Sequence, residues 1–427
     1  MRLILIDLPT PNRIHFEPLA FSRPIWELRC GMTSLAEKLA AKLAPPETAG
    51  FVPEYLAEVV RSRTTWPIND PASLTGADLL VVDPRLKADA LDVKPDGPSE
   101  VGLDEDGNVL YARIAQADAM KLEAASIEQL LDSAKAALPT VECKLPRWNY
   151  VWDLVLANPG QIAEDFAAAG RSGIEGTIEQ PRALRGSEKD LYVAPGALVH
   201  PMVVIDAVNG PVYIDADAEI LPFSRIEGPC YVGPKSMLLA SNCREGNSIG
   251  PVCRVGGEVE ESIIQGYSNK YHDGFLGHAY VGEWVNLGAM TTNSDLKNDY
   301  SPVSVVLDGR KPISTGSTKV GSLIGDHTKT SIGTLLNTGA YVGAMALLVG
   351  SGKPLPKYVP SFTWYLDGAI TKGFGKGKLY ETAKVAMSRR KMKWTDADEA
   401  MWDAVFEQTA EVRDAAVKKG RRQLLRK

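Results

Sequence analysis

Cysteine is scarce in this sequence, and the spacing of the cysteines argues against a structural zinc site or a dithiol redox site. Five cysteines occur among 427 residues, and no two of them form a Cys-x-x-Cys pair, the usual motif of structural zinc and dithiol redox sites. Three of the five lie in the repeats described below, at positions suited to a small apolar residue. We therefore expect these three thiols to be buried in the core. The five are Cys30, Cys143, Cys230, Cys243 and Cys253.

Long apolar runs are also missing. No stretch approaches the roughly 20 residues that a membrane-spanning helix needs. The opening run Met1–Asp7 is too short for a signal peptide and predicts a buried strand. These absences predict a cytoplasmic protein that does not act at a membrane, and no motif predicts nucleic-acid binding.

The net charge is small, at −6, but it is unevenly distributed. Residues 370–427 carry fifteen Lys or Arg against eight Asp or Glu. A basic segment on an acidic protein favours a phosphate-bearing ligand or an anionic partner. The solvated surface of a helix would show the same excess, and the sequence leaves both interpretations open.

The most informative pattern is a ladder of aliphatic residues spaced mostly six apart. A period of six fits neither a helix, near 3.6, nor an isolated strand, at 2. It fits a solenoid with three short strands per coil, in which one side chain per strand points inward and small residues follow at the corners. The pattern predicts a left-handed parallel β-helix of the hexapeptide type. The ladder is Ile214, Ile220, Ile226, Val232, Leu238, Cys243, Ile249, Val255, Val281 and Leu287.

Three domains are expected. Short aliphatic runs at 3–6 and 79–82, with helical patterns between and after them, predict an α/β, Rossmann-like domain over residues 1–185. The β-helix is expected over 186–360, with a non-repetitive excursion at 293–319. Residues 361–427 predict a helical tail, with one helix over 378–393 and a second over 396–419 that begins at Thr395 as N-cap.

Polar side chains gather within about two coils of the predicted β-helix. Transfer of an acyl group from a thioester to an amine needs a base, donors for the oxyanion, and polar groups that hold the acceptor. Histidine suits the role of base because its ordinary pKa lies near neutrality. The residues alone leave a second interpretation open, in which each histidine is an ordinary surface or corner residue. The cluster is Asn269, Lys270, His272, Asn286 and Asn293.

Three segments of this region, Ser268-Asn-Lys-Tyr-His272, Phe275-Leu-Gly277 and Val285-Asn-Leu-Gly-Ala289, carry a resemblance. Over about residues 240–295 the chain resembles the acetyltransferase domain of the bifunctional bacterial enzymes that acetylate glucosamine-1-phosphate and then uridylylate it. The resemblance implies that His272 is the catalytic base, that acetyl-CoA is the co-substrate and that Ala289 contacts it. Arg244, Asn286 and Asn293 match residues that hold the acceptor, and Asn269 and Lys270 of the same cluster are expected to bind substrate as well.

The chain departs from that family at several positions. A lysine of the family aligns near Ser262 in this sequence. Phe275 stands where the family has a tyrosine, and Met290 stands where it has the glycine that follows Ala289. These departures leave the identity of the acceptor open. A less favoured alternative is a carbonic anhydrase-like β-helix, in which His272, His278 and His327 of neighbouring subunits would hold Zn²⁺. The asparagine-rich cluster has no role in that chemistry.

The segment Phe16–Leu39 resembles the start of sugar-nucleotide pyrophosphorylases, and the layout of the whole chain resembles sugar nucleotidyltransferases with a C-terminal β-helix. Asn12-Arg13 stands where that family has a glycine-rich phosphate loop, although the glycines are absent. The resemblance implies binding of a sugar-1-phosphate and a nucleoside triphosphate, with Arg13 and Arg23 supplying positive charge. It also implies Mg²⁺ on Asp83, with Asp153 as a candidate second ligand, while a plain turn at Asp83 is an equal alternative.

Together these expectations describe a transferase that modifies sugar phosphates. The β-helix would pass an acetyl or other acyl group from acyl-CoA to an amino sugar, and the N-terminal domain would carry out nucleotidyl transfer. Hexapeptide transferases bind CoA between neighbouring β-helices, which implies a homotrimer. The rival is a non-catalytic or regulatory protein that binds a sugar phosphate or nucleotide.

Overall fold

The computed structural model describes residues 1–94 and 96–425, and these cluster into two compact units. The N-terminal unit comprises residues 1–13, 22–28 and 34–149, and the C-terminal unit comprises 14–21, 29–33 and 150–427. Among the described residues, no helix combines the length and the apolar character needed to cross a membrane.

The N-terminal unit is built on a six-stranded mixed sheet with the order β4-β1-β5-β7-β6-β8. β1 lies in parallel between β4 and β5, whereas β7 runs antiparallel to β5 and β6. The aliphatic runs that predicted buried strands form β1 and β5. The strands are β1 (Arg2–Ile6), β4 (Glu47–Phe51), β5 (Leu79–Val82), β6 (Glu100–Leu103), β7 (Val109–Ile114) and β8 (Thr140–Glu142).

Four helices belong to this unit: α1 (Leu35–Leu43), α2 (Glu54–Arg63), α3 (Gln116–Ala119) and α4 (Ile127–Ala137). α1 begins at a capping box, in which the Ser34 hydroxyl accepts from the Glu37 amide and the Glu37 carboxylate accepts from the Ser34 amide. α4 packs its apolar face, with Leu130 at its centre, into the same core as the sheet. The short strands β2 (Arg29–Cys30) and β3 (Thr33–Ser34) pair with each other.

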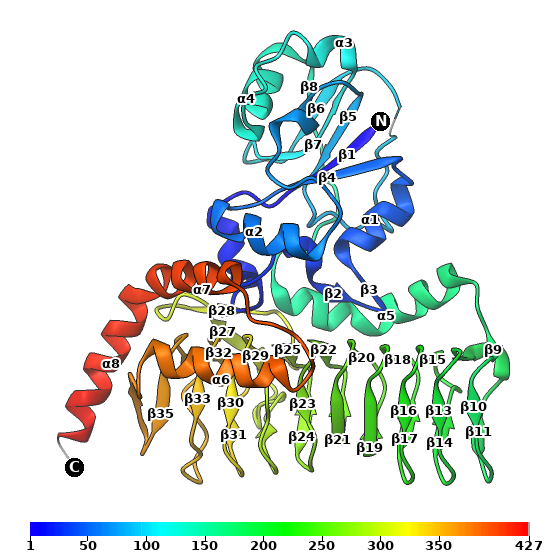
Figure 1. Cartoon of the computed structure of the whole chain (residues 1–427), viewed down its shortest axis with the longest axis vertical. Coiled ribbons are helices and arrows are strands. Elements are labelled where there is room, and N and C mark those ends of the chain that lie inside the picture. Colours follow the sequence, from blue (N-terminus) through cyan, green and yellow to red (C-terminus); the bar gives the residue numbers. More distant parts are fainter. Residues whose placement is uncertain (95, 426–427) are drawn as a thin grey trace. The chain divides into compact units, whose positions relative to one another are not determined.

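The C-terminal unit is a parallel β-helix with three columns of short strands (Figure 1). The first column is β9 (Gly173–Ile174), β12 (Leu191–Val193), β15 (Val212–Ile214), β18 (Cys230–Val232), β20 (Asn247–Ile249), β22 (Ile263–Gly266), β25 (Tyr280–Glu283), β29 (Leu323–Ile324), β32 (Tyr341–Val342) and β34 (Tyr358–Val359). The second contains β10 (Thr177–Ile178), β13 (Leu198–Val199), β16 (Glu219–Ile220), β23 (Asn269–Lys270), β30 (Lys329–Thr330), β33 (Leu347–Leu348) and β35 (Trp364–Leu366), which pairs with β36 (Ala369–Thr371). The third contains β11 (Ala183–Arg185), β14 (Val204–Asp206), β17 (Arg225–Glu227), β24 (Phe275–Gly277), β26 (Thr292–Asn293) and β31 (Leu335–Leu336), while β19 (Met237–Cys243) and β21 (Arg254–Glu260) continue from the second column into the third.

The six-residue ladder forms the core of this β-helix. Each of its ten residues is at most 3% exposed, and all ten belong to one apolar cluster. Small residues follow them because the coils approach closely at the corners: a Cβ at Gly250 would collide with the backbone carbonyl of Gln265 on the next coil. The predicted fold class, an α/β domain followed by a parallel β-helix and C-terminal helices, is confirmed.

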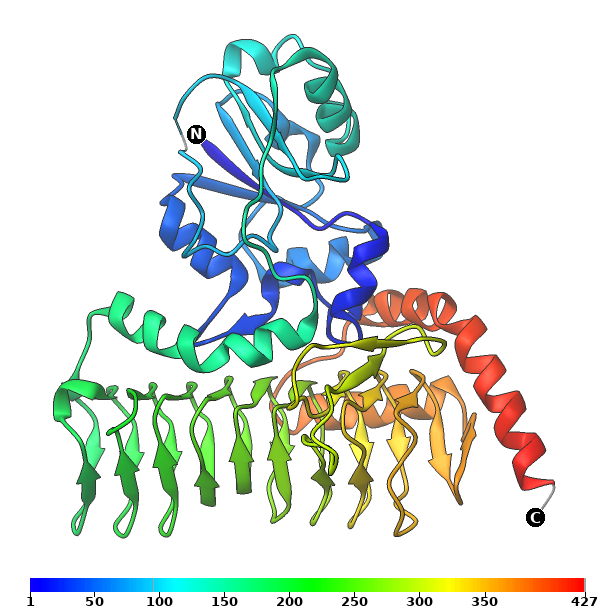
Figure 2. The same cartoon turned by 180° about the vertical axis from the view of Figure 1, so that it is seen from behind.

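Helix α5 (Val151–Ala169) runs along the first column of the β-helix (Figure 2). Its buried Asn158 accepts from the Gly31 amide at 2.7 Å and donates to the Gly246 carbonyl at 2.8 Å. Tyr192 and Tyr213 form part of the apolar cluster on the same face. The predicted excursion contains the antiparallel hairpin of β27 (Ser304–Val306) and β28 (Pro312–Ser314).

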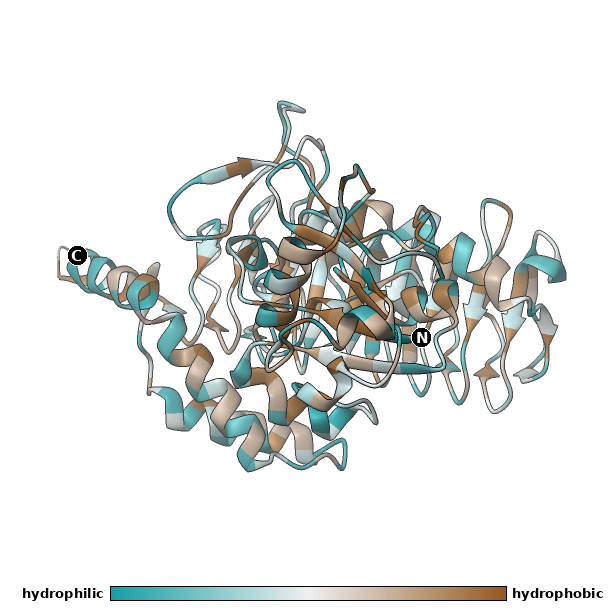
Figure 3. Ribbon diagram, turned by 90° about the horizontal axis from the view of Figure 1, so that it is seen from above, coloured by the Kyte–Doolittle hydropathy of each residue, from teal (hydrophilic) through white to brown (hydrophobic). Residues whose placement is uncertain are grey.

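The C-terminal tail contains α6 (Lys376–Ser388), α7 (Asp396–Gln408) and α8 (Ala410–Leu424). Thr395 caps α7 as predicted, but the single helix predicted over 396–419 is wrong, because the chain breaks at Thr409. The Thr409 hydroxyl donates to the Val405 carbonyl at 2.8 Å, and Arg413 donates to the Phe406 carbonyl at 2.7 Å. Side chains therefore satisfy carbonyls at the end of α7. Towards its C-terminal end α8 is largely hydrophilic (Figure 3).

Candidate active sites

His272 and Ala289 line one open cavity of about 650 Å³ on the β-helix. They lie on successive coils, because the Met290 amide donates to the Asp273 carbonyl at 2.7 Å. His272 is exposed, and its ring is tilted against that of Tyr271 with the centroids 5.0 Å apart. The structure thus brings the predicted base and the predicted acetyl-CoA contact into the same cavity.

Lys270 lies inside the β-helix, 4% exposed, rather than in the cavity. It stands six residues after Ile264 and six before Leu276, so it occupies an inward position of the repeat. Its ammonium donates to the carbonyls of Gly256, at 2.7 Å, and His272, at 3.0 Å. Burial lowers the pKa of Lys270 to about 8. The side chain therefore fixes the backbone of His272.

Asn293 is also an inward residue, six positions after Leu287. Its side-chain oxygen accepts from the Gly277 amide and its nitrogen donates to the Gly277 carbonyl, both at 2.8 Å. At 2% exposure its amide holds one coil to the next. Its predicted role in binding the acceptor stays a prediction.

Asn269 and Asn286 point outward on the second column and line a different cavity, which we call the α6 pocket. The Asn269 side chain donates to that of Asn286 at 3.3 Å and accepts from Arg390, just beyond α6, at 2.9 Å. The predicted polar cluster is therefore divided between two cavities. The α6 pocket is lined by Tyr267, Asn269, Trp284, Val285, Asn286, Lys329, Thr382, Val385, Ala386, Arg389 and Arg390.

Arg244 lies just beyond the end of β19, among carboxylates. It forms an ion pair with Glu260 at 2.7 Å and approaches Glu258 at 3.7 Å. Lys319 approaches the other oxygen of Glu260 at 3.3 Å. A phosphate at Arg244 would therefore compete with two glutamates for the guanidinium.

The histidines of the alternative zinc site have different surroundings. His278 is buried between carboxylates, with Nδ1 2.9 Å from Asp295 and Nε2 3.3 Å from Glu261. His327 is buried among rings, 6.0 Å from Trp394 and 5.7 Å from Trp402 by their centroids. The described part of the chain brings three potential metal ligands together once, at Glu245, Glu260 and Glu261, and that group has no histidine. The zinc interpretation needs histidines of neighbouring subunits and stays a prediction, although within one chain both ring nitrogens of His278 already contact carboxylates.

In the N-terminal unit, a cavity of about 480 Å³ opens at the carboxyl ends of β1 and β5. Two aspartate–arginine pairs line it. Arg13 approaches Asp7 at 3.3 Å, and Arg85 holds both oxygens of Asp83, with its closest contact at 2.6 Å. Burial raises the pKa of Asp7, although the neighbouring Arg13 opposes this. The carboxyl ends of parallel strands are where open α/β sheets bind ligands.

The remaining predicted residues of this half lie elsewhere. Arg23 is 1% exposed and is not part of the cavity lining. Asp153 belongs to the C-terminal unit, where its carboxylate accepts from the Tyr150 amide at 3.0 Å in the first turn of α5. Sequence reasoning missed Asp7 and Arg85. The sequence held a signal for Arg85, because this residue follows Asp83 by two positions, with a proline between them.

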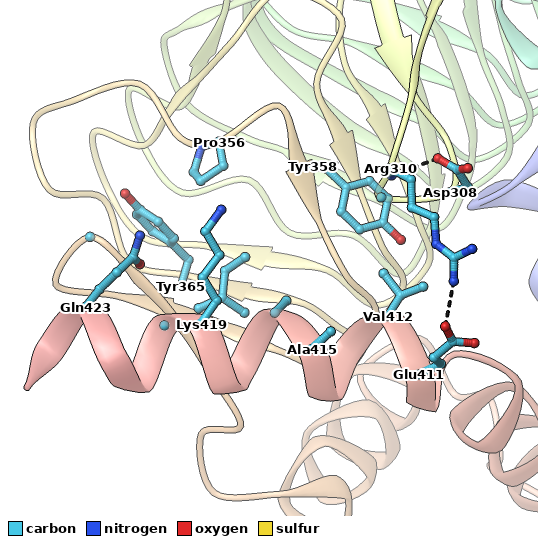
Figure 4. A pocket seen from close by; sticks show the side chains of 15 residues that line it. Asp308, Arg310, Pro356, Tyr358, Tyr365, Glu411, Val412, Ala415, Lys419 and Gln423 are labelled. Carbon is cyan, nitrogen blue, oxygen red and sulfur yellow. Dashed lines mark hydrogen bonds and ion pairs between the residues drawn. The ribbon is translucent and has the colours of Figure 1, made fainter.

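A further cavity, of about 470 Å³, lies between α8 and the last coils (Figure 4). Arg310 and Glu411 face each other at one end, 2.5 Å apart. Lys419, Tyr365 and Gln423 lie together at the other end. Because Arg310 is paired with a carboxylate on the rim, this cavity shows no unmatched charge there.

Comparison with known proteins bears on both halves. Residues 3–172 match the model of a family described as "Sugar nucleotidyl transferase". The chain is 36% identical over 151 residues to a bifunctional sugar-1-phosphate nucleotidylyltransferase/acetyltransferase of Sulfurisphaera tokodaii, covering 33% of this chain and 35% of that protein. It is 26% identical over 233 residues to the bifunctional protein GlmU of Synechococcus elongatus, covering 53% of this chain and 43% of that protein.

The chain thus spans about a third to two fifths of the length of these curated relatives. Among solved structures, a UDP-N-acetylglucosamine acyltransferase of Francisella novicida aligns over 57% of this chain and 90% of its own, with 13% identity and a TM-score of 0.31, a likeness too weak to bear on function. The resemblance seen in the sequence is confirmed: residues 3–172 match the sugar nucleotidyl transferase family, and the chain is similar to bifunctional nucleotidylyltransferase/acetyltransferases.

Proposed function

We propose that this protein is a transferase of sugar phosphates whose β-helix passes an acyl group from acyl-CoA, acetyl-CoA in the simplest case, to an amino sugar phosphate. The observation that carries the proposal is the shared cavity of His272 and Ala289. The names of the curated relatives, which include acetyltransferases, support it.

In this reaction His272 takes a proton from the acceptor amine as the amine nitrogen attacks the thioester carbonyl carbon. The new C–N bond forms and the C–S bond breaks, and protonated His272 returns the proton to the departing sulfur, so that CoA leaves as its thiol. Lys270 acts as a positioning residue because its ammonium binds the backbone carbonyl of His272. Arg244 is one of the residues predicted to hold the acceptor. We propose that its ion pair with Glu260 must break before it binds a phosphate.

We also propose that the active form is a homotrimer. Large apolar side chains are exposed at the rim of the His272 cavity, with Phe223 74% and Met290 56% exposed. Met202 continues the same corner, because its carbonyl accepts from the Phe223 amide. Packing of neighbouring β-helices would cover these residues and close the groove. Light scattering at micromolar concentration should give the mass of a trimer, and a monomer mass would contradict this proposal.

For the N-terminal unit we propose binding of a nucleoside triphosphate and a sugar-1-phosphate at the cavity lined by Arg13 and Arg85. Mg²⁺ on Asp83 would fit poorly, since both oxygens of Asp83 accept from Arg85. Metal binding there, with or without Asp153, requires Arg85 to release the carboxylate. This pairing favours a second candidate for this half, a binding or regulatory site without nucleotidyl transfer.

His272→Ala tests the acyltransferase proposal. We expect release of free thiol from acetyl-CoA, in the presence of an amino sugar phosphate, to fall by about a hundred-fold or more. His200→Ala is the matched control, because His200 is a partly exposed histidine of the same β-helix that contacts Glu219. Thiol release that is equal in the two variants would overturn the role of His272.

A further inference from the structure

Three cationic residues line the α6 pocket, and a fourth lies close to it. It occupies about 240 Å³ between the second column of the β-helix and α6. Lys329, Arg389 and Arg390 line it, and Arg254 lies near enough to Arg390 to act on its charge. The lining contains no aspartate or glutamate.

None of these four cations forms an ion pair with a carboxylate of the described residues. Their bonds go to neutral groups instead. Arg254 donates to the carbonyls of Lys235 and Cys253, both at 2.9 Å, Lys329 donates to the Trp284 carbonyl, and Arg390 donates to the Asn269 side chain. The Nε of Arg390 is buried and makes no hydrogen bond within the described part of the chain.

The surroundings of Arg390 and Lys329 disfavour their charged forms. Burial and repulsion by Arg254 and Arg389 lower the pKa of Arg390. Burial also lowers the pKa of Lys329 to about 7, and the charge of Asp326 opposes this only in part. Charges that are partly withdrawn from water and lack a counter-charge gain from an anion that binds beside them.

The size and walls of the pocket narrow the class of anion. Its volume lies below the range of about 300–1,000 Å³ typical of whole small-molecule sites, so it admits one compact group rather than a nucleotide. The rings of Tyr267 and Trp284 stack beside it with their centroids 4.6 Å apart. Arginine binds phosphate oxygens through paired N–H donors, and two arginines together suit that group.

We propose that the α6 pocket anchors the phosphate group of a larger ligand, whose remainder lies outside it. Arg389 and Arg390 bind the phosphate oxygens, and Lys329 supplies a third hydrogen-bond donor from the β-helix. The site is separate from the His272 cavity. It is tested by binding alone, so its failure is distinguishable from a failure of acyl transfer.

The test is isothermal titration calorimetry of the full chain with three probes: inorganic phosphate, adenosine 3′,5′-bisphosphate and uridine diphosphate. Wild-type protein should bind at least one of them, and Arg390→Gln should bind it about tenfold or more weakly. Arg389→Gln should also weaken binding of the probe. Because Arg389 is exposed, this substitution should not disturb folding. Arg422→Gln, an exposed arginine of α8 outside the pocket, should bind as wild type does.

The probes distinguish the possible sources of the phosphate. Tightest binding of the adenosine bisphosphate points to the nucleotide end of an acyl-CoA, and tightest binding of uridine diphosphate points to a nucleotide sugar. Equal binding of all three would overturn the larger ligand and leave a site for phosphate alone. The proposal is overturned if wild-type protein binds no probe, or if Arg389→Gln and Arg390→Gln both bind as tightly as Arg422→Gln.

Discussion

The two units of this molecule treat positive charge in opposite ways. In the N-terminal cavity each arginine has its own aspartate, Arg13 with Asp7 and Arg85 with Asp83. In the α6 pocket, Arg389, Arg390 and Lys329 share a small volume without a carboxylate. A region whose charges are already matched is stable without a ligand, whereas a region of unmatched charge is stabilised by an anion.

This difference also affects how readily each unit binds a phosphate. A phosphate that enters the N-terminal cavity must compete with two aspartates for the arginines. A phosphate in the α6 pocket competes with no carboxylate of the lining. We therefore expect the β-helix unit to bind anions strongly. In the N-terminal unit, we expect removal of a charge to lower the free energy of unfolding substantially.

The largest effect on stability is expected from Asp83→Asn. Asp83 is buried and the Arg85 side chain is only 11% exposed, so the substitution leaves Arg85 without its main counter-charge. We expect the free energy of unfolding of the N-terminal unit to fall by about 3 kcal/mol. Urea denaturation measures this, with Asp89→Asn, at an exposed position, as control. A loss no larger than that of the control would show that the pair is not structural.

The pH dependence of His278 gives the next largest effect. Burial alone would lower its pKa, but hydrogen bonds with Asp295 and Glu261 outweigh burial and raise the pKa to about 9. Its stabilising contribution is therefore fully present below the ordinary histidine pKa of about 6.5 and is lost as the pH rises through about 9.

His278→Gln should consequently lower stability by about 2 kcal/mol at pH 6 and by progressively less towards pH 9. The measurement is the difference in free energy of unfolding between wild type and variant across this range. Lys270 and Lys329 also titrate, but they are present in both proteins and their contributions cancel in the difference. A difference independent of pH would mean that His278 is not charged in the folded protein.

Lys270→Met should have a smaller effect, on turnover alone. The methionine fills the same inward position but cannot donate to the carbonyl of His272. We expect kcat for thiol release to fall about tenfold, with the KM for the acceptor unchanged, because the lysine positions the base and does not touch substrate. A rise in KM with kcat unchanged would instead support the direct role in substrate binding that the sequence predicts.

The smallest effect is expected from Arg389→Gln without ligand. Removal of one charge from an unpaired, partly exposed cluster should change the free energy of unfolding by no more than about 0.5 kcal/mol. Urea denaturation alongside Asp83→Asn provides the direct contrast. A loss comparable to that of Asp83→Asn would show that the two regions do not differ in the way described.

The fold was predictable because the spacing of ladder residues is a local property of the sequence. The same spacing held information about the site. Lys270 continues the series from Ile264 to Leu276, and Asn293 continues the series from Leu287, so both were marked as inward residues despite their polarity. Asn269 and Asn286 each precede an inward residue and therefore face outward, away from the corner that carries His272.

Charge partners were less predictable because they depend on tertiary contacts. Asp7 meets Arg13 within one short segment, yet its burial at the end of β1 depends on the whole sheet. Arg390 lies 121 residues from Asn269, and only the return of α6 onto the β-helix brings them together. The basic excess of residues 370–427 indicated an anion or a solvated helix, and the described positions of Arg389 and Arg390 support the first for this pair.

Turnover by the wild-type protein tests the central claim, acyl transfer in the His272 cavity, most directly. The protein is incubated with acetyl-CoA and a panel of amino sugar 1-phosphates, and free thiol is recorded separately from the pyrophosphate released in parallel incubations with nucleoside triphosphates. The account predicts thiol release that depends on both acetyl-CoA and one class of acceptor, whether or not pyrophosphate appears. Thiol release no faster than the acceptor-free blank across the whole panel would contradict it.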